Sequence, residues 1–258
     1  MAVFHGSVSI SSDRSNPPAL DASPPARPVF YGRRQGRRLR PHRAQLWDTL
    51  LPNLRVVVPA GSARIDPRSL FAPPISDVWL EIGFVGGEHI AAQAEANPQV
   101  GLIGAEPFVN GVATLLASID ERPLTNIRIF PDDVRLLLAA IEDVSIARAF
   151  ILFPDPWPKL RHHRRRIVGP QTLDALARIL VDGAELRLAT DHPGYVQWML
   201  WHLIRHPAFA WRARSPTDWR QRPADWPETR YEAKALAEGK SCTFLTFERV
   251  ARQGVGRP

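Results

Sequence analysis

The stretch from Phe153 to Ile167, FPDPWPKLRHHRRRI, combines a carboxylate held between prolines with a dense cationic cluster. Its three alternating prolines fix φ and bias the residue before each of them away from the helical region, so we expect a stiff, extended segment. It would hold Asp155 and Trp157 in place, ahead of Lys159 and a run of arginines and histidines suited to phosphates. The stretch indicates a site that binds a polyanion and does chemistry beside it; a solvated surface loop is the alternative.

Acidic residues recur at the ends of the strands that the sequence predicts. The carboxyl ends of parallel strands share one edge of a sheet, where open α/β sheets bind their ligands, so these acids should line a single site. One such acid often only caps a helix, but a full series is harder to explain by capping alone. The series is Glu81, Glu106, Asp132 or Asp133, Asp155 and Asp191.

A glycine turn, EIGFVGGE, joins the first predicted strand to the first helix at residues 81–88. Such a turn lets backbone N–H groups approach a ligand, although the dinucleotide fingerprint G-x-G-x-x-G is not met. Glu106 follows at the end of the second strand, where an acid can bind a ribose diol. Turn and acid together fit a nucleoside-containing cofactor, whether S-adenosylmethionine, NAD or FAD.

Hydrophobic patterning supplies the elements that would position these residues. Strands and helices of ordinary length alternate, which predicts an α/β fold with a mostly parallel central sheet and helices on both faces. We predict strands at 77–83, 100–107, 126–133, 147–153, 184–191 and 242–250, and helices at 45–54, 87–97, 110–119, 134–141, 170–181 and 193–206.

Composition narrows the choice of partner and compartment. The chain of 258 residues has a net charge of +7, which favours nucleic acid as a partner and an anionic membrane surface second. A single cysteine, Cys242, excludes an intrachain disulfide. No apolar run is long enough to span a membrane, no secretory signal is indicated, and the histidines lack the spacing of a metal site. We therefore expect a cytoplasmic protein without membrane or metal.

The N-terminus divides into two parts. Residues 1–28 are rich in Ser, Pro and Ala and are predicted to form a disordered tail. Residues 29–43 hold six arginines and are predicted to form a flexible basic arm that lies along phosphates, or a tail that is merely solubilising. The arm would precede a single domain, so that the folded unit spans residues 29–258.

From residue 29 to the end, these motifs resemble the bacterial tRNA (guanine-N7-)-methyltransferase family. The Pro-Asp-Pro-Trp-Pro-Lys block is the most specific of them. The resemblance implies a Rossmann-like class I S-adenosylmethionine-dependent methyltransferase, acting as a monomer or homodimer. It would methylate N7 of a guanine in the variable loop of tRNA. The matching segments are LEIGFVGGEH, GAEPFVNGV, NIRIFPDD, FPDPWPKLRHHRRRI, LATDHPGYV, TRYE, TFER and the basic segment FYGRRQGRRLRP.

The resemblance also implies which residues form the site. The predicted cofactor contacts are Glu81, Gly83, Glu106, Asp133 and Asp155. The predicted contacts to the guanosine or its surroundings are Lys159, Asp191, Thr229, Arg230, Tyr231 and Glu232. Asp155, ahead of Asp191, is the catalytic candidate: it would accept hydrogen bonds from the N1–H and amino group of guanine. Trp157 would pack on cofactor or base, or serve as a structural wedge.

Val85 departs from the family pattern, because it stands where the glycine turn usually has its middle glycine. A β-branched residue disfavours a positive φ, so the cofactor would bind more weakly or the turn would be rebuilt around Gly86 and Gly87. Tyr231, where the family more often has Phe, should be tolerated. Val85 motivates the alternative of a catalytically inactive Rossmann-like RNA-binding protein. A nucleotide-dependent oxidoreductase is disfavoured by the failed fingerprint and the basic loop.

Overall fold

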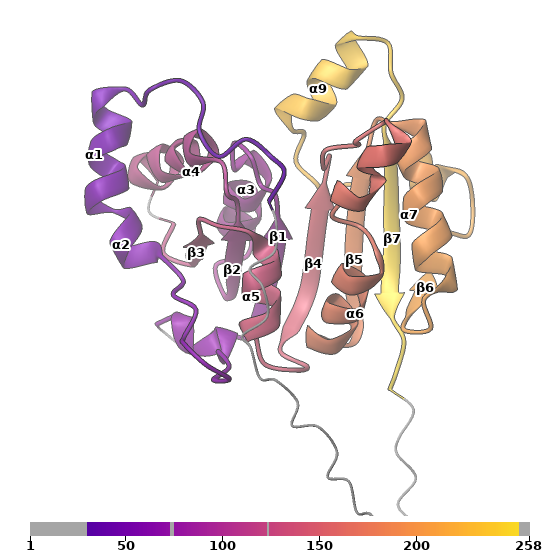
Figure 1. Ribbon diagram of the computed structural model, residues 1–258, viewed down its shortest axis with the longest axis horizontal. Coiled ribbons are helices and arrows are strands. Elements are labelled where there is room, and N and C mark those ends of the chain that lie inside the picture. The colour runs from indigo at the N-terminus through magenta and orange to yellow at the C-terminus, as the bar shows by residue number, and fades with distance from the viewer. Residues whose placement is uncertain (1–29, 73–74, 123, 253–258) are drawn as a thin grey trace, which may run out of the picture.

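A seven-stranded sheet forms the centre of the protein, in a computed structural model that describes residues 30–72, 75–122 and 124–252 (Figure 1). The strand order is β3-β2-β1-β4-β5-β7-β6; β1 to β5 pair in parallel, and β7 is antiparallel to both of its neighbours. The predicted mostly parallel sheet is thus confirmed, whereas the predicted tail at 1–28 lies outside the described residues. The strands are β1 (Asp77–Ile82), β2 (Val100–Ala105), β3 (Ile127–Phe130), β4 (Ile146–Leu152), β5 (Leu180–Thr190), β6 (Phe209–Trp211) and β7 (Thr243–Arg249).

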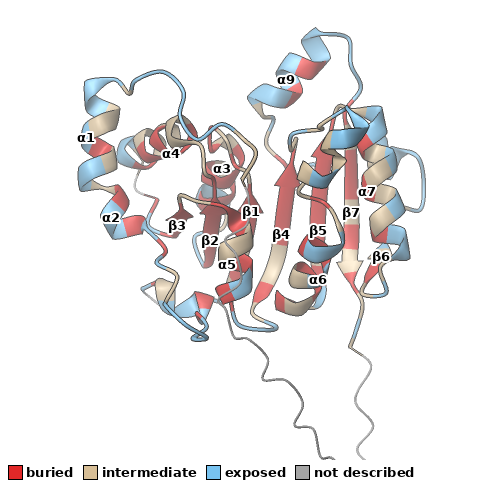
Figure 2. Cartoon of the chain, viewed as in Figure 1, coloured by how far each residue is buried: buried red, intermediate tan, exposed pale blue. Residues whose placement is uncertain are grey.

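Helices cover both faces of the sheet, as predicted. One apolar core lies between the sheet and α5, α6 and α7; a second lies between the sheet and α1 to α4. Figure 2 shows the strands buried between these layers. No helix in the described parts of the chain could cross a membrane. The helices are α1 (Pro41–Thr49), α2 (Leu51–Leu54), α3 (Glu88–Ala96), α4 (Val109–Glu121), α5 (Val134–Ala140), α6 (Pro170–Ile179), α7 (Pro193–Arg205), α8 (Thr217–Arg220) and α9 (Arg230–Ala237), with 3-10 turns η1 (Pro67–Leu70) and η2 (Leu160–Arg165).

The N-terminal helical region differs from the prediction of one helix over 45–54. Helix α1 begins earlier, because Pro41 occupies its first position, where a missing N–H costs nothing. The helix then breaks at Leu50, and the short α2 follows with Pro52 in its first turn. The short elements β6, α8 and α9 and both 3-10 turns were not predicted, since none exceeds eight residues, which is too short to establish a periodicity.

The strand order reverses its direction at β1. From β1 the chain winds outward through β2 and β3 on one side, and then returns to β4 and β5 on the other. Ligands of such sheets bind at this reversal, beyond the carboxyl ends of the strands. Gly104 of β2 pairs with Glu81 of β1 there, and a Cβ on it would lie 2.6 Å from the Phe84 ring. The glycine therefore lets the turn after β1 pack closely against the sheet.

Replacing Gly104 by alanine should destabilise the fold by about 1–3 kcal/mol, because the methyl group overpacks a site bounded by Phe84 and Ile90. Gly169→Ala is the matched control, since a Cβ there meets nothing within 4 Å. Urea unfolding followed by circular dichroism measures both. Equal midpoints for the two variants would contradict the close approach of Phe84.

Candidate functional site

Glu106 is the buried centre of the acidic series. Its Oε2 accepts the Val85 N–H at 2.9 Å and its Oε1 accepts the Phe108 N–H at 2.8 Å. Burial raises the pKa of this carboxyl, the two hydrogen bonds oppose the rise, and the negative charges of Asp155 and Glu81 add to it. The structure therefore brings together three predicted acids that lie far apart in the sequence, at the carboxyl ends of β1, β2 and β4.

The glycine turn has a positive φ at three positions, and Val85 is one of them. Val85 has φ 46°, and Gly83 and Gly87 have φ 75° and 80°. The hydrogen bond to Glu106 holds Val85 in a conformation that valine disfavours. The two predicted outcomes, weaker cofactor binding or a turn rebuilt around Gly86 and Gly87, stay predictions. Gly111 of α4 leaves room for the Val85 carbonyl group, since a Cβ on Gly111 would lie 2.1 Å from that oxygen.

The end of β1 is open on the side where a ligand would lie. A Cβ on Gly83 would meet nothing within 4 Å. Glu81, two residues earlier in β1, is buried, and its Oε2 lies 2.7 Å from His89 Nδ1. His89 was not predicted as a site residue; its position next to the glycine turn, in GGEH, was the available signal.

The two acids after β3, Asp132 and Asp133, each pair with an arginine of the protein. Asp133 is buried, caps α5 by accepting the Arg135 N–H at 3.0 Å and pairs with the same arginine's side chain. Asp132 lies 2.8 Å from the Arg34 guanidinium. Of the two alternatives for this strand, Asp133 is the more buried, and it is oriented by Arg135.

The basic arm is docked at its centre, so the prediction of a flexible arm is wrong for residues 34–37. The Val109 N–H donates to the Arg34 carbonyl, and Asn110 bonds the backbone of both Gly36 and Arg37. In Figure 1 the segment ahead of α1 runs over the N-terminal end of α4. The arm therefore lies along the same edge of the sheet as the acids.

The Pro-Asp-Pro-Trp-Pro segment is not uniformly extended. Phe153 and Trp157, each before a proline, have φ of 48° and 41°, so the predicted extended conformation is wrong at both. Strained backbone of this kind persists where packing holds it. Asp155, between them, is open to solvent on one side, yet the surrounding protein partly desolvates it and raises its pKa.

The cationic cluster divides into exposed and structural members. Arg166 is buried: its Nε donates to the Pro156 carbonyl at 2.8 Å, and its guanidinium stacks on Tyr195 and Trp198. The prediction that it binds phosphate is therefore wrong. Arg165 lies over the rings of Tyr31 and Trp157, which makes Trp157 a structural wedge on this side. The exposed cations are Lys159, Arg161 and Arg164.

The segment Thr229 to Glu232 proves to be the N-terminal cap of α9. Thr229 Oγ1 accepts the Glu232 N–H, and Glu232, buried, accepts the Thr229 N–H in return and pairs with Arg222 at 2.9 Å. This capping box, T-x-x-E, was the overlooked signal for α9. Two of its predicted substrate residues thus shape the helix instead of facing the site.

The other two residues of that segment do face the site. Arg230 forms an ion pair with Glu88 across the glycine turn. Burial raises the pKa of the Tyr231 phenol, and among its smaller causes are the charges of Glu106 and Asp155. Figure 1 shows α9 lying beyond the carboxyl end of β4, so the segment covers the site from the side opposite the arm.

Asp191 lies at a second position on the same edge, after β5. It pairs with Lys240 at 3.1 Å and lines an open pocket of about 280 Å³ together with Gln197 and Thr243. Lys159 is exposed, and no ion pair or hydrogen bond to its side chain is seen within the described chain.

No group of three or more His, Cys, Asp or Glu in the described ranges could hold a metal ion.

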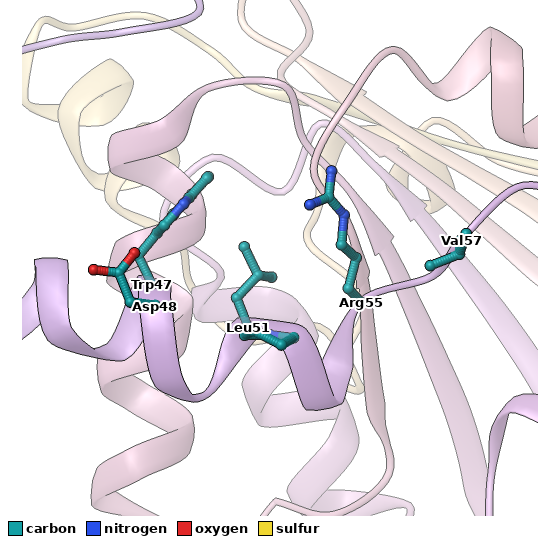
Figure 3. A pocket seen from close by; sticks show the side chains of 6 residues that line it. Trp47, Asp48, Leu51, Arg55 and Val57 are labelled. Atoms are coloured by element: carbon teal, nitrogen blue, oxygen red, sulfur yellow. The ribbon is translucent and has the colours of Figure 1, made fainter.

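A larger open pocket, of about 400 Å³, lies away from the acids. It is lined by residues from α1, α2 and the segment that follows them, and none of the predicted site residues belongs to it (Figure 3). The convergence of carboxylates, and not pocket volume, therefore defines the candidate site. The lining residues are Trp47, Asp48, Leu51, Pro52, Arg55 and Val57.

Comparison with known proteins agrees with this geometry. Residues 76–245 match a family described as "Putative methyltransferase". A tRNA (guanine-N(7)-)-methyltransferase of Rhodospirillum rubrum is 56% identical over 86% of this chain and 88% of its own. That of Paramagnetospirillum magneticum is 52% identical over 88% and 94%. The chain belongs to the tRNA (guanine-N(7)-)-methyltransferase family.

Membership in this family confirms the predicted resemblance and the methyltransferase class, and S-adenosylmethionine is the methyl donor. The alternative of an inactive RNA-binding protein has no support. The solved 16S rRNA methyltransferase KamB matches 76% of this chain and 99% of its own with a TM-score of 0.51 and 16% identity. That likeness confirms the Rossmann-like class I methyltransferase fold.

Val85→Gly should raise the free energy of unfolding by about 0.5–1 kcal/mol. The left-handed conformation costs valine about 1–2 kcal/mol, and the extra backbone freedom of glycine in the unfolded chain offsets part of the gain. Val85→Ala retains a Cβ and should gain nothing. Urea unfolding of the three proteins measures this; a less stable glycine variant would show that the valine side chain contributes more by packing than its backbone costs.

Arg164→Ala should weaken tRNA binding and reduce the slope of log affinity against log salt by about one, because one phosphate contact is lost. Arg166→Ala should instead lower the free energy of unfolding by about 1–3 kcal/mol, since it removes a buried hydrogen bond and two ring contacts. Fluorescence anisotropy over a salt series and thermal unfolding separate the two effects. An Arg164 variant with an unchanged salt slope would contradict the phosphate contact.

Proposed function

We propose that this protein transfers a methyl group from S-adenosylmethionine to N7 of a guanine in the variable loop of tRNA, in the cytoplasm. The observation that carries the proposal is the meeting of Glu81, Glu106 and Asp155 beside the glycine turn, next to the exposed cations of residues 159–164. A carboxylate site bordered by cations suits a nucleoside cofactor and a polyanionic substrate together. Its oligomeric state, monomer or homodimer, stays a prediction.

The residues at the turn fit the cofactor. The open space beside Gly83 leaves room against the backbone, and Glu106, whose carboxylate oxygens each retain a lone pair, can accept from a ribose diol. Glu81 suits the cationic amino group, and Asp133 borders the site, oriented by Arg135. When bound, S-adenosylmethionine supplies an electrophilic methyl group on a sulfonium sulfur.

The reaction requires chiefly that the protein align guanine N7 with the methyl group. Guanine N7 has an exposed lone pair and needs no base, so the rate depends on holding N7 in line with the methyl group. We propose that Asp155 accepts hydrogen bonds from the N1–H and amino group of guanine, which stabilises the positive charge that develops on the ring. In this arrangement Tyr231 and Arg230 border the base. Asp191 and Lys159 contact the surroundings of the guanosine.

The direct test is transfer of labelled methyl from S-adenosylmethionine to unmodified bulk tRNA. Wild type should yield N7-methylguanine, and Asp155→Ala should lose at least about a hundredfold in kcat/KM, a loss typical of removing a transition-state hydrogen bond. Asp174→Ala is the matched control, an exposed acid on α6 paired with His206. Label in another nucleotide position, or full activity of Asp155→Ala, would contradict the proposal.

The pH dependence should report on Asp155. Desolvation raises the pKa of this carboxyl, and only the ionised form can accept both hydrogen bonds. Activity is therefore lost as the pH falls through the raised pKa, so the acid limb of kcat/KM should lie above the ordinary aspartate value of about 3.9. A pH–rate profile measures it, with Asp155→Asn expected to abolish the limb. A limb at or below the ordinary value would rule out this role.

A further inference from the structure

A buried chain of polar side chains leads away from the proposed site through α3. Glu81 Oε2 lies 2.7 Å from His89 Nδ1, and both side chains are at most 3% exposed. On the far side of the ring, His89 Nε2 lies 3.5 Å from Gln93 Nε2, which donates to the Asp225 carbonyl at 2.7 Å. The chain thus joins the end of β1 to the loop that precedes α9.

Its hydrogen bonds assign the tautomer of His89. The Asp225 carbonyl can only accept, so the group that Gln93 turns toward it must be the NH₂. Asn97 Nδ2 donates to Gln93 Oε1, which supports the same orientation. Gln93 therefore presents a donor to His89 Nε2, which must accept. The ring proton then sits on Nδ1 and is donated to Glu81.

Aromatic rings hold the imidazole in this orientation. The Phe150 ring of β4 packs against it edge-on at 4.7 Å between centroids, and the Trp226 ring lies 6.1 Å away. The Trp226 carbonyl accepts from Arg222, which also pairs with Glu232 of the α9 capping box. The environment of His89 is therefore built partly from the segment that carries Tyr231 and Arg230.

We propose that His89 is a positioning residue for the methyl-transfer reaction. It holds Oε2 of Glu81 through Nδ1–H, so that Oε1, which no described residue bonds, faces the amino group of S-adenosylmethionine. Through Gln93 the same chain ties this carboxylate to the loop before α9, so the cofactor side and the substrate side of the site share one support. The inference rests on the proposed function, because it assigns His89 a task in cofactor binding.

Two substitutions separate the donor from the ring. His89→Asn removes the ring, but its amide N–H group can take the place of Nδ1–H as the donor. His89→Phe keeps the ring packing but removes the donor. We expect His89→Asn to bind S-adenosylmethionine within about threefold of wild type and His89→Phe to lose about tenfold or more, since an unpaired buried carboxylate is left free to turn. A packing role alone predicts the reverse order and would overturn the proposal.

Calorimetric titration of full-length protein with S-adenosylmethionine measures the affinities, with thermal unfolding recorded to confirm that each variant is folded. Long-range ¹H–¹⁵N NMR of wild type gives a second test that needs no buried substitution. It should show a protonated Nδ1 and an accepting Nε2 on His89; a proton on Nε2 alone would overturn the proposal.

Different results would contradict the proposed function and the role of His89. Wild type that neither binds S-adenosylmethionine nor methylates tRNA would remove the proposed function itself. Wild type that does both, while His89→Phe binds the cofactor as tightly as His89→Asn, would remove only the role of His89. In steady-state kinetics the expected His89→Phe defect lies in KM for S-adenosylmethionine more than in kcat, which general destabilisation would not produce.

Discussion

The buried carboxylate of Glu106 is the constraint on which the rest of the site depends. It accepts backbone N–H groups from the glycine turn after β1 and from the start of α4, and so ties the ends of two strands to each other. Its hydrogen bond to the Val85 N–H offsets the cost of the left-handed backbone there, while the Gly83 N–H donates to the Ala105 carbonyl and ties the turn to β2. Burial raises the pKa of this carboxyl, and the negative charges of Asp155 and Glu81, which lie around it, raise it further.

Two segments from opposite ends of the chain close on this group of acids. The arm is held at α4 through Asn110 and reaches Arg165 through Tyr31, whereas α9 reaches the glycine turn through Arg230. Neither segment belongs to the central sheet, and both carry exposed cations. The sheet thus supplies a rigid row of strand ends, and the arm and α9 bring positive charge and aromatic rings to the edge where those strands end.

The basic loop after β4 shows how one run of similar residues can serve two purposes. Arg166 turns inward, where a carbonyl and two rings replace water, and thereby anchors the loop to α7. Arg161 and Arg164, beside it in the sequence, stay in solvent. Arg161 and Arg164 are three residues apart in the 3-10 turn η2 and so share one face, whereas Arg166 follows the end of the turn in an extended conformation.

The sequence by itself determined the alternation of elements, the parallel sheet, the acidic series and the family, because hydrophobic periodicity, proline placement and the Pro-Asp-Pro-Trp-Pro-Lys block are local signals. Only the tertiary structure decided which charges are free. Arg166 is interior and His89 supports Glu81, because folding packs these side chains against partners from other elements. The cap that Thr229 and Glu232 form is different, since its T-x-x-E pattern is local and was overlooked. Burial and partners, which no local pattern encodes, separate a charge that binds a ligand from one that holds the fold.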